Sequence, residues 1–278
     1  MAGHWTLDDI AWDKFDPAKV DSEMLKAVKA ASMVEFNAAA YVSYLKNVFP
    51  DDPEAHAAFE QWGREETQHG LALRRWAEIA DPSFDFEDSF ARFQAGYRPA
   101  HFDSGEAARG SRRGEMVARC VVECGTSSYY TAIKDATDEP VLKQVAGHIA
   151  ADEYRHYRLF YDVMHKLDEK PLPLWRSVYV ALTRMNEADD DELAYAFYCA
   201  NVPAEAAAAA PYKRKIYSRA YEARAMRFYR RRHIDKAVQM VAKAAGLNPQ
   251  GSVTKWGGFL AWNYLRLRLP RDGAAAGA

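Results

Sequence analysis

The chain carries one acidic pattern twice: a single glutamate is followed about thirty residues later by the sequence Glu-x-x-His. The lone glutamates are 88 residues apart and the two Glu-x-x-His pairs are 87 residues apart, so the pattern reads as a pseudo-repeat. Four carboxylates and two imidazoles in this arrangement are the ligand set with which a four-helix bundle holds two iron or manganese ions in its core. The predicted metal ligands are Glu35, Glu66, His69, Glu123, Glu153 and His156.

The spacing within each copy is consistent with one shared site. Glu35 lies 13 residues before Val48, and Glu66 lies 13 residues after Pro53, with a turn predicted at residues 49–52. Two antiparallel helices joined by this turn rise and fall by the same ~20 Å, at about 1.5 Å per residue, so both glutamates reach one height. Positions i and i+3 share a helical face, so each Glu-x-x-His supplies a carboxylate and an imidazole together. The second copy repeats this spacing.

Charge balance favours a metal site over a set of structural side chains. Carboxylates that face a dry core are strongly penalised unless they are protonated or paired, and four negative charges neutralise two divalent cations. Carboxylate-rich ligation with one histidine per metal suits iron or manganese better than zinc. We therefore predict two iron ions, Fe(II) or Fe(III), with manganese in one or both positions as an alternative. The competing interpretation is four solvent-exposed glutamates on helix surfaces.

The predicted fold class is all-α: a ferritin-like four-helix bundle followed by additional C-terminal helices. The bundle helices are expected at residues 22–48, 53–80, 106–136 and 140–167, and residues 82–105 form the single long crossover. Asp138 is the predicted N-cap of the fourth helix, with Pro140 in its first turn. Residues 1–168 are assigned to the bundle, with an N-terminal arm at 1–20. Residues 174–269 are assigned to a helical extension that packs on it, with helices at 174–187, 190–200 and 211–245, and residues 270–278 to a disordered tail.

Composition limits the class of protein. The formal net charge of −2 predicts no global attraction to nucleic acid. The three cysteines, Cys120, Cys124 and Cys199, lack the spacing of a disulfide framework or of a cysteine metal site. No apolar run reaches the ~18 residues of a membrane span, and the first residues lack the order of a signal peptide. A soluble cytoplasmic protein is the expectation.

Two segments resemble a known family. Residues 62–70, Trp-Gly-Arg-Glu-Glu-Thr-Gln-His-Gly, resemble the Trp-x-x-Glu-Glu-x-x-His-Gly segment of the soluble acyl-carrier-protein desaturases. Residues 149–156, Ile-Ala-Ala-Asp-Glu-Tyr-Arg-His, resemble that family's Ile-Ala-Ala-Asp-Glu-x-Arg-His. The resemblance covers roughly residues 25–167 and is specific at these two segments. It implies the same six metal ligands.

The resemblance also implies roles for neighbouring residues. Asp152 matches a carboxylate that orients a ligand histidine through its ring N–H; the alternative is a solvated charge. Thr126 lies three residues after Glu123, where the family carries a threonine near the oxygen site, so it is the candidate catalytic residue. Its alternative is a hydroxyl bonded to the carbonyl one turn earlier. Trp5 and Trp12 are candidates for the family's electron-transfer tryptophan, and the sequence favours neither.

The implied activity is that of an O2-activating non-haem di-iron oxidase acting on an unactivated C–H bond, most closely acyl-carrier-protein-linked fatty acyl desaturation. The implied partners are a ferredoxin-like electron donor and an acyl carrier protein with its acyl chain, and the implied assembly is a homodimer. Alternatives are a di-iron monooxygenase of a tRNA nucleoside or an arylamine, and a non-catalytic ferritin-like iron-binding protein. The arylamine oxygenases carry an added histidine where this chain has Ile149; His148 is one position away and is interpreted as structural.

A basic stretch at residues 212–236 bears on partners. It would attract an acidic acyl carrier protein, and its interleaved aromatic residues also suit RNA, by base stacking and phosphate contacts. A solvated helix with inward-facing aromatic rings is the alternative. The candidate partner-binding residues are Lys213, Arg214, Lys215, Arg230, Arg231 and Arg232.

Overall fold

A computed structural model describes residues 4–97, 99, 105–186, 191–207 and 209–268. These residues form helices, turns and connecting segments without a β-strand, which confirms the predicted all-α class. The helices are α1 (Ser22–Phe36), α2 (Ala38–Val48), α3 (Pro53–Ala80), α4 (Phe86–Gly96), α5 (Arg112–Ala136), α6 (Pro140–Lys166), α7 (Leu174–Asn186), α8 (Asp191–Asn201), α9 (Arg214–Met226), α10 (Arg231–Ala244) and α11 (Ser252–Arg268).

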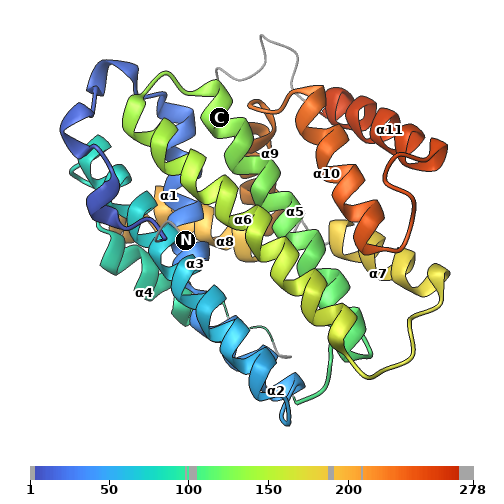
Figure 1. Cartoon of the computed structure of the whole chain (residues 1–278). Coiled ribbons are helices and arrows are strands. Elements are labelled where there is room, and N and C mark those ends of the chain that lie inside the picture. Colours follow the sequence, from blue (N-terminus) through green and yellow to red (C-terminus); the bar gives the residue numbers. More distant parts are fainter. Residues whose placement is uncertain (1–3, 98, 100–104, 187–190, 208, 269–278) are drawn as a thin grey trace.

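Four helical rods surround the centre of the molecule: α1 together with α2, then α3, α5 and α6 (Figure 1). The pair α5 and α6 and the pair formed by α1–α2 and α3 each pack side by side, and α3 also contacts α6. The C-terminal helices cover this core, because α7 and α10 pack on α5 while α8 packs on α1. Ahead of α1, an arm of three short 3-10 turns crosses α6, where Ala11 N donates to Gln144 Oε1 at 3.0 Å.

The predicted helix at residues 22–48 is divided at Asn37, two residues after Glu35. Asn37 N still bonds to Met33 O at 3.1 Å, so the rod continues with a local change of direction. The break lies where α3 comes closest: a Cβ placed on Gly70 would be 2.6 Å from Phe36 N. Only glycine permits this approach, which seats the end of α1 directly against the Glu-x-x-His segment of α3.

Other boundaries also differ from the prediction. The expected crossover contains α4, and the third rod begins at Arg112, capped by Ser111, rather than at residue 106. The predicted helix 211–245 is divided into α9 and α10, whereas the aromatic segment near the C-terminus is helix α11. The predicted disordered tail at 270–278 lies outside the described residues.

The N-cap of α6 is Glu139, not Asp138. Its carboxylate accepts hydrogen bonds from Val141 N at 3.2 Å and Leu142 N at 2.7 Å, and also from Trp76 Nε1 at 2.8 Å. Glu139 is fully buried, and these donors compensate its desolvation. A buried indole donor on another helix is a tertiary partner that the local sequence does not reveal.

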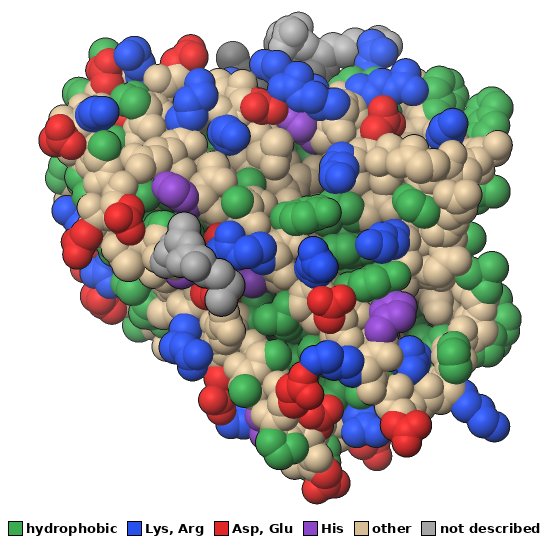
Figure 2. All heavy atoms as spheres, viewed as in Figure 1, with side chains coloured by type: hydrophobic (Ala, Val, Ile, Leu, Met, Phe, Trp, Pro, Cys, Tyr) green, Lys and Arg blue, Asp and Glu red, His purple; other side chains and the backbone are tan. Residues whose placement is uncertain are grey.

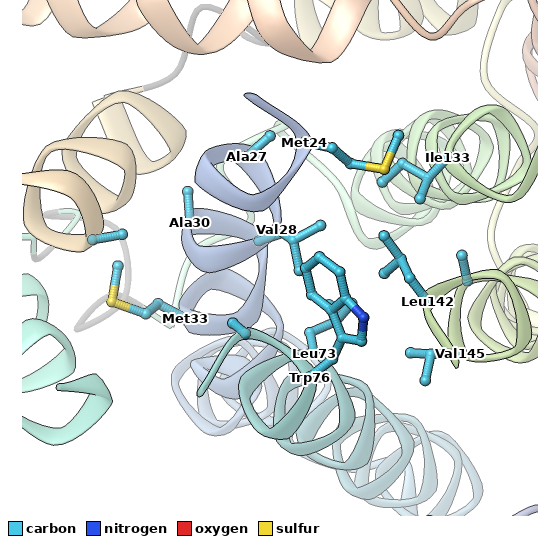
Figure 3. Close-up of a cluster of buried hydrophobic side chains, with 14 of the residues drawn as sticks. Met24, Ala27, Val28, Ala30, Met33, Leu73, Trp76, Ile133, Leu142 and Val145 are labelled. Atoms are coloured by element: carbon cyan, nitrogen blue, oxygen red, sulfur yellow. The ribbon is translucent and has the colours of Figure 1, made fainter. Parts of the chain in front are cut away.

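Two hydrophobic clusters occupy the two ends of the bundle, and a polar layer separates them. Figure 3 shows part of the first cluster, in which side chains of α1, α3, α5 and α6 meet around Trp76. The second cluster includes Leu45, Phe59, Met116 and Phe160. Each rod passes from one cluster to the other through a predicted metal ligand, so both ends of the polar layer are sealed by apolar side chains.

Large apolar side chains remain exposed on α7 and α11. Trp175 and Trp256 are 69% and 65% exposed, and each is accompanied on its helix by exposed leucine and tyrosine side chains. Figure 2 shows hydrophobic side chains along the margin of the molecule where these two helices lie in Figure 1. None of the described helices combines the length and apolar character needed to cross a bilayer.

Candidate metal centre

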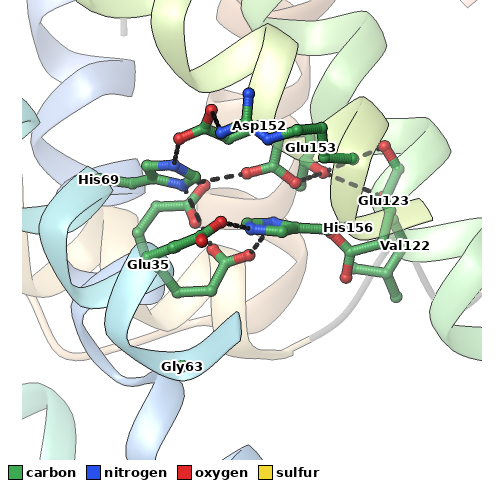
Figure 4. A network of polar contacts seen from close by, with 12 residues as sticks. Glu35, Gly63, His69, Val122, Glu123, Asp152, Glu153 and His156 are labelled. Atoms are coloured by element: carbon green, nitrogen blue, oxygen red, sulfur yellow. Dashed lines mark hydrogen bonds and ion pairs between the residues drawn. The ribbon is translucent and has the colours of Figure 1, made fainter. Parts of the chain in front are cut away.

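The structure brings all six predicted metal ligands together in the polar layer (Figure 4). One comes from α1, two from α3, one from α5 and two from α6, and all are buried. Their ligand atoms form two overlapping groups, in each of which the atoms lie within 4.8 Å of one another. The groups are Glu35, Glu66, His69 and Glu153, and Glu66, Glu123, Glu153 and His156.

Glu66 and Glu153 belong to both groups, whereas each lone glutamate and each histidine belongs to one. A carboxylate has two oxygens and can therefore bridge two cations. The arrangement can hold two cations with Glu66 and Glu153 between them, one cation beside Glu35 and the other beside Glu123. The buried cluster thus has donors placed so that they could hold metal.

The ligand atoms face one another without hydrogen bonds. His69 Nδ1 lies 3.2 Å from Glu153 Oε1, and His156 Nδ1 lies 2.9 Å from Glu66 Oε1. A ring nitrogen lone pair and a carboxylate oxygen at these distances repel each other unless a proton or a metal ion lies between them. Both Nδ1 atoms and both oxygens of Glu123 are buried without a hydrogen-bond partner. Buried polar atoms are normally satisfied, so these orphaned atoms fit a cation.

The Nε2 atom of each histidine, on the side of the ring away from the cluster, bonds to a carboxylate on the other of the two helices α3 and α6. His69 Nε2 on α3 donates to Asp152 Oδ2 on α6 at 3.0 Å, and His156 Nε2 on α6 donates to Glu65 Oε2 on α3 at 2.8 Å. Burial is the largest influence and raises the pKa of both carboxyls, but the hydrogen bonds and charge of the histidine, together with those of other neighbours, outweigh it and keep both pKa values below the usual range. These bonds fix the tautomer that leaves each Nδ1 facing the cluster.

The sequence predicted Asp152 in this role and missed Glu65. The signal was present, because an acidic residue immediately precedes each Glu-x-x-His. Each acid, however, bonds to the histidine of the other helix, Asp152 of α6 to His69 of α3 and Glu65 of α3 to His156 of α6. The sequence alone does not show this pairing.

The side chains of the cluster change one another's pKa values. Burial, with the charge of a neighbouring glutamate added, raises the pKa of Glu35 and Glu123 well above the usual range. Burial raises the pKa of Glu66 as well, but the close approach of Glu35 and of both histidines outweighs burial and holds it well below the usual range. Burial lowers the pKa of His69 and His156, and the surrounding carboxylates outweigh it and raise both. Without a metal, protons must take the place of cations.

Trp5 joins the cluster from the N-terminal arm. Its Nε1 donates to Asp152 Oδ2 at 2.7 Å, and its ring is parallel to that of His69, with the centroids 6.1 Å apart. The ring of His148 stacks on the ring of Trp5, with the centroids 5.0 Å apart. His148 belongs to neither group of candidate ligands. Trp12 lies elsewhere, with its indole bonded to Leu7 O. Of the two tryptophans, Trp5 alone reaches the outer carboxylate.

Two hydroxyl groups bond to the cluster. Thr126 Oγ1 donates to Glu153 Oε2 at 2.5 Å and also lies 3.3 Å from Val122 O. The hydroxyl therefore contacts a candidate metal ligand and the carbonyl one turn earlier at the same time. Tyr130 Oη donates to Glu35 Oε1 at 2.5 Å from a fully buried position. Of these two residues, the sequence identified only Thr126.

The predicted partner-binding residues lie at two places. Lys213, Arg214 and Lys215 lie at the start of α9, and Arg230, Arg231 and Arg232 at the start of α10. Acids from distant parts of the chain pair with some of them: Arg232 contacts Asp135 on α5 at 2.6 Å. The interleaved Tyr221 and Phe228 are buried in the core, so they are not exposed for base stacking.

A cavity of about 530 Å³ lies between α2 and α5 and the nearby ends of α4, α7 and α8. Its wall combines apolar residues, such as Leu45 and Ala118, with polar and charged ones: Tyr41, Tyr44, Tyr97, Glu115, Arg119 and Arg184. It is not an apolar tunnel.

No protein-family model matches this chain, and no curated protein matches it significantly. The resemblance to desaturases therefore rests on the two segments at residues 62–70 and 149–156.

Proposed function

We propose that the chain binds two iron ions in the Glu/His layer and uses them to activate O2 for oxidation of an unactivated C–H bond. The observation that carries the proposal is the pair of overlapping ligand groups with orphaned, buried donor atoms. Carboxylates and imidazoles in this ratio suit iron, with manganese as the alternative metal. Two reduced iron ions would supply the electrons that activate O2, the oxidant, because no protein side chain provides them.

The fold assignment forms part of the same proposal. We assign the four rods to a ferritin-like bundle and the chain to a group similar to the soluble acyl-carrier-protein desaturases. The support is the two matching segments together with ligands from four rods that meet at one height.

The chain's own residues prepare the site. The hydrophobic clusters at both ends exclude water, which strengthens every electrostatic interaction inside. Asp152 and Glu65 hold the two histidines in position, and Thr126 places a hydroxyl against Glu153. These contacts fix the ligand geometry before a substrate binds.

Trp5 would carry electrons from a ferredoxin-like donor toward the metal ligands. Trp5, Asp152 and His69 form a continuous hydrogen-bonded chain that starts on the N-terminal arm. We expect Trp5→Phe, which keeps a ring but removes the N–H, to slow metal reduction by a protein donor while metal content stays unchanged. Reduction at the wild-type rate in stopped-flow measurements would refute this route.

Two substrate classes follow. The resemblance favours desaturation of an acyl chain carried by acyl carrier protein. The polar wall of the cavity favours hydroxylation of a polar organic molecule, a class that includes nucleosides and arylamines. A homodimer would cover the exposed apolar faces of α7 and α11.

The test is O2 consumption by the Fe(II)-loaded protein with reductant and a panel of saturated acyl carrier proteins and small polar substrates. Glu123→Gln removes the charge of a buried ligand, whereas Glu60→Gln changes an exposed glutamate of α3 and serves as the control. Product formation that Glu123→Gln abolishes and Glu60→Gln preserves supports the proposal. Iron binding without substrate oxidation would contradict it and favour an iron-binding protein without catalysis.

A further inference from the structure

The cavity between α2 and α5 leads toward the metal centre along one face of α5. Glu115, Ala118 and Arg119 line it, and Val122 and Thr126 continue the same helical face. Arg119 and Glu123 are four residues apart, which is about 6 Å of helical rise. Its volume of about 530 Å³ lies within the ~300–1,000 Å³ range of small-molecule sites. A molecule held at Arg119 therefore lies about one helical turn from the candidate metal ligand Glu123.

Arg119 carries an uncompensated positive charge in this wall. Its guanidinium carbon lies 5.0 Å from the ring centroid of Tyr41 and 5.5 Å from that of Trp62, and it makes no hydrogen bond or ion pair within the described part of the chain. Stacking on aromatic rings engages the faces of a guanidinium, and its N–H groups point outward in the plane. These N–H groups remain for an acceptor that the described residues do not supply.

The acids of the same wall are already engaged. Glu115 Oε1 accepts a hydrogen bond from Arg109 N at 2.5 Å. Asp191 accepts a hydrogen bond from the Tyr212 hydroxyl and lies 3.9 Å from Arg214 Nε. Neither acid pairs with Arg119, so the group missing from the cavity is an anion.

A second donor without a partner lies beside Arg119. The indole nitrogen of Trp62 is buried and has no hydrogen-bond partner among the described residues, although buried polar groups are normally satisfied. Trp62 is 4% exposed, and Arg119 lies over its ring. Two donors without a partner among the described residues, one of them charged, therefore lie next to each other: Arg119 in the cavity wall and Trp62 directly behind it.

We propose that this cavity binds a small organic acid, with Arg119 holding its carboxylate and the aromatic side chains contacting its planar body. That this acid is the oxidised substrate rests on the function proposed above; the binding itself does not. A carboxylate matches the in-plane donors of a guanidinium in two parallel hydrogen bonds. The acyl chain of a thioester offers no such anion to Arg119.

Binding of benzoate tests the proposal, with the uncharged isostere benzamide as comparison. Isothermal titration is carried out on the full chain, both metal-free and Fe(II)-loaded without oxygen. We expect benzoate to bind in both states, at least tenfold more tightly than benzamide, and Arg119→Gln to weaken it at least tenfold in both. Arg158→Gln, an exposed arginine on α6 outside this cavity, is the matched control and should bind benzoate normally.

Three results overturn the proposal: no benzoate binding, binding that Arg119→Gln leaves unchanged, and binding only when metal is present, because the carboxylate would then ligate the metal itself. If Arg119→Gln does not fold, the wild-type protein still decides. The Trp62 indole signal in a ¹⁵N-labelled sample must shift when benzoate is added, and an unmoved signal refutes the site. Because the metal-free measurement requires no oxidation, failure of the catalytic proposal leaves this one standing.

Discussion

The carboxylates behind the two histidines give a quantitative prediction. Asp152→Asn and Glu65→Gln remove a charge that no metal touches, yet each should weaken metal binding, because the histidine loses the acceptor that fixes its tautomer. Losses of this kind are typically 10–100-fold, or about 1.4–2.8 kcal/mol. Asp152 is fully buried and accepts from His69, Trp5 and Arg155, so its loss should lie near the upper end. Glu65, with a side chain 13% exposed, should lie near the lower end, because water can replace its carboxylate.

The assay is an anaerobic Fe(II) titration against a competing chelator, with circular dichroism to verify the fold. Asp162→Asn is the control, since that carboxylate lies on α6 with 59% of its side chain exposed, 3.8 Å from Arg158, and should not change affinity. Wild-type affinity in a folded Asp152→Asn variant would refute the crosswise support of the histidines.

Three further outcomes are expected. Gly70→Ala should lower the melting temperature, because its Cβ would lie 2.6 Å from Phe36 N and overpacking costs roughly 1–3 kcal/mol. Gly125→Ala is the control and should leave the melting temperature unchanged, because there is open space around its Cβ. Equal effects of the two substitutions would contradict the close approach at Gly70. Glu139→Gln should destabilise the protein by about 1–3 kcal/mol in urea unfolding, since it weakens the buried bonds at the start of α6; an unchanged midpoint would count against that cap. The apparent affinity for Fe(II) should rise as the pH is raised, because the metal displaces protons from Glu35 and Glu123, whose pKa values are raised. Titrations that show no proton release would contradict this linkage.

The six ligands could be predicted because their positions depend on local geometry. Equal helix lengths on both sides of a short turn fix the height of Glu35 and Glu66, and the i, i+3 spacing fixes the face of His69. Both relations hold along one helix or one hairpin, where the sequence is informative. The all-α class follows from the same periodicity.

The surroundings of the site depend on tertiary contacts and were predicted less well. Which histidine Glu65 meets depends on the rotation of α3 against α6, which no sequence spacing states. Trp5 lies on an arm of short turns whose path is set by its bonds to the bundle, such as Gln68 Nε2 to Trp5 O at 2.8 Å. Similarly, the first rod is divided at Asn37, next to the close contact between Phe36 and Gly70 of α3. The acid that pairs with Arg232 is Asp135, which lies 97 residues away in the sequence.

Anomalous X-ray scattering at the iron edge, on crystals of protein loaded with Fe(II) and analysed for metal content, tests the central claim most directly. The account predicts two iron ions per chain and two anomalous peaks in the polar layer, flanked by Glu35 and His69 on one side and by Glu123 and His156 on the other. A chain that takes up neither Fe(II) nor Mn(II), or peaks that lie away from these side chains, would contradict it.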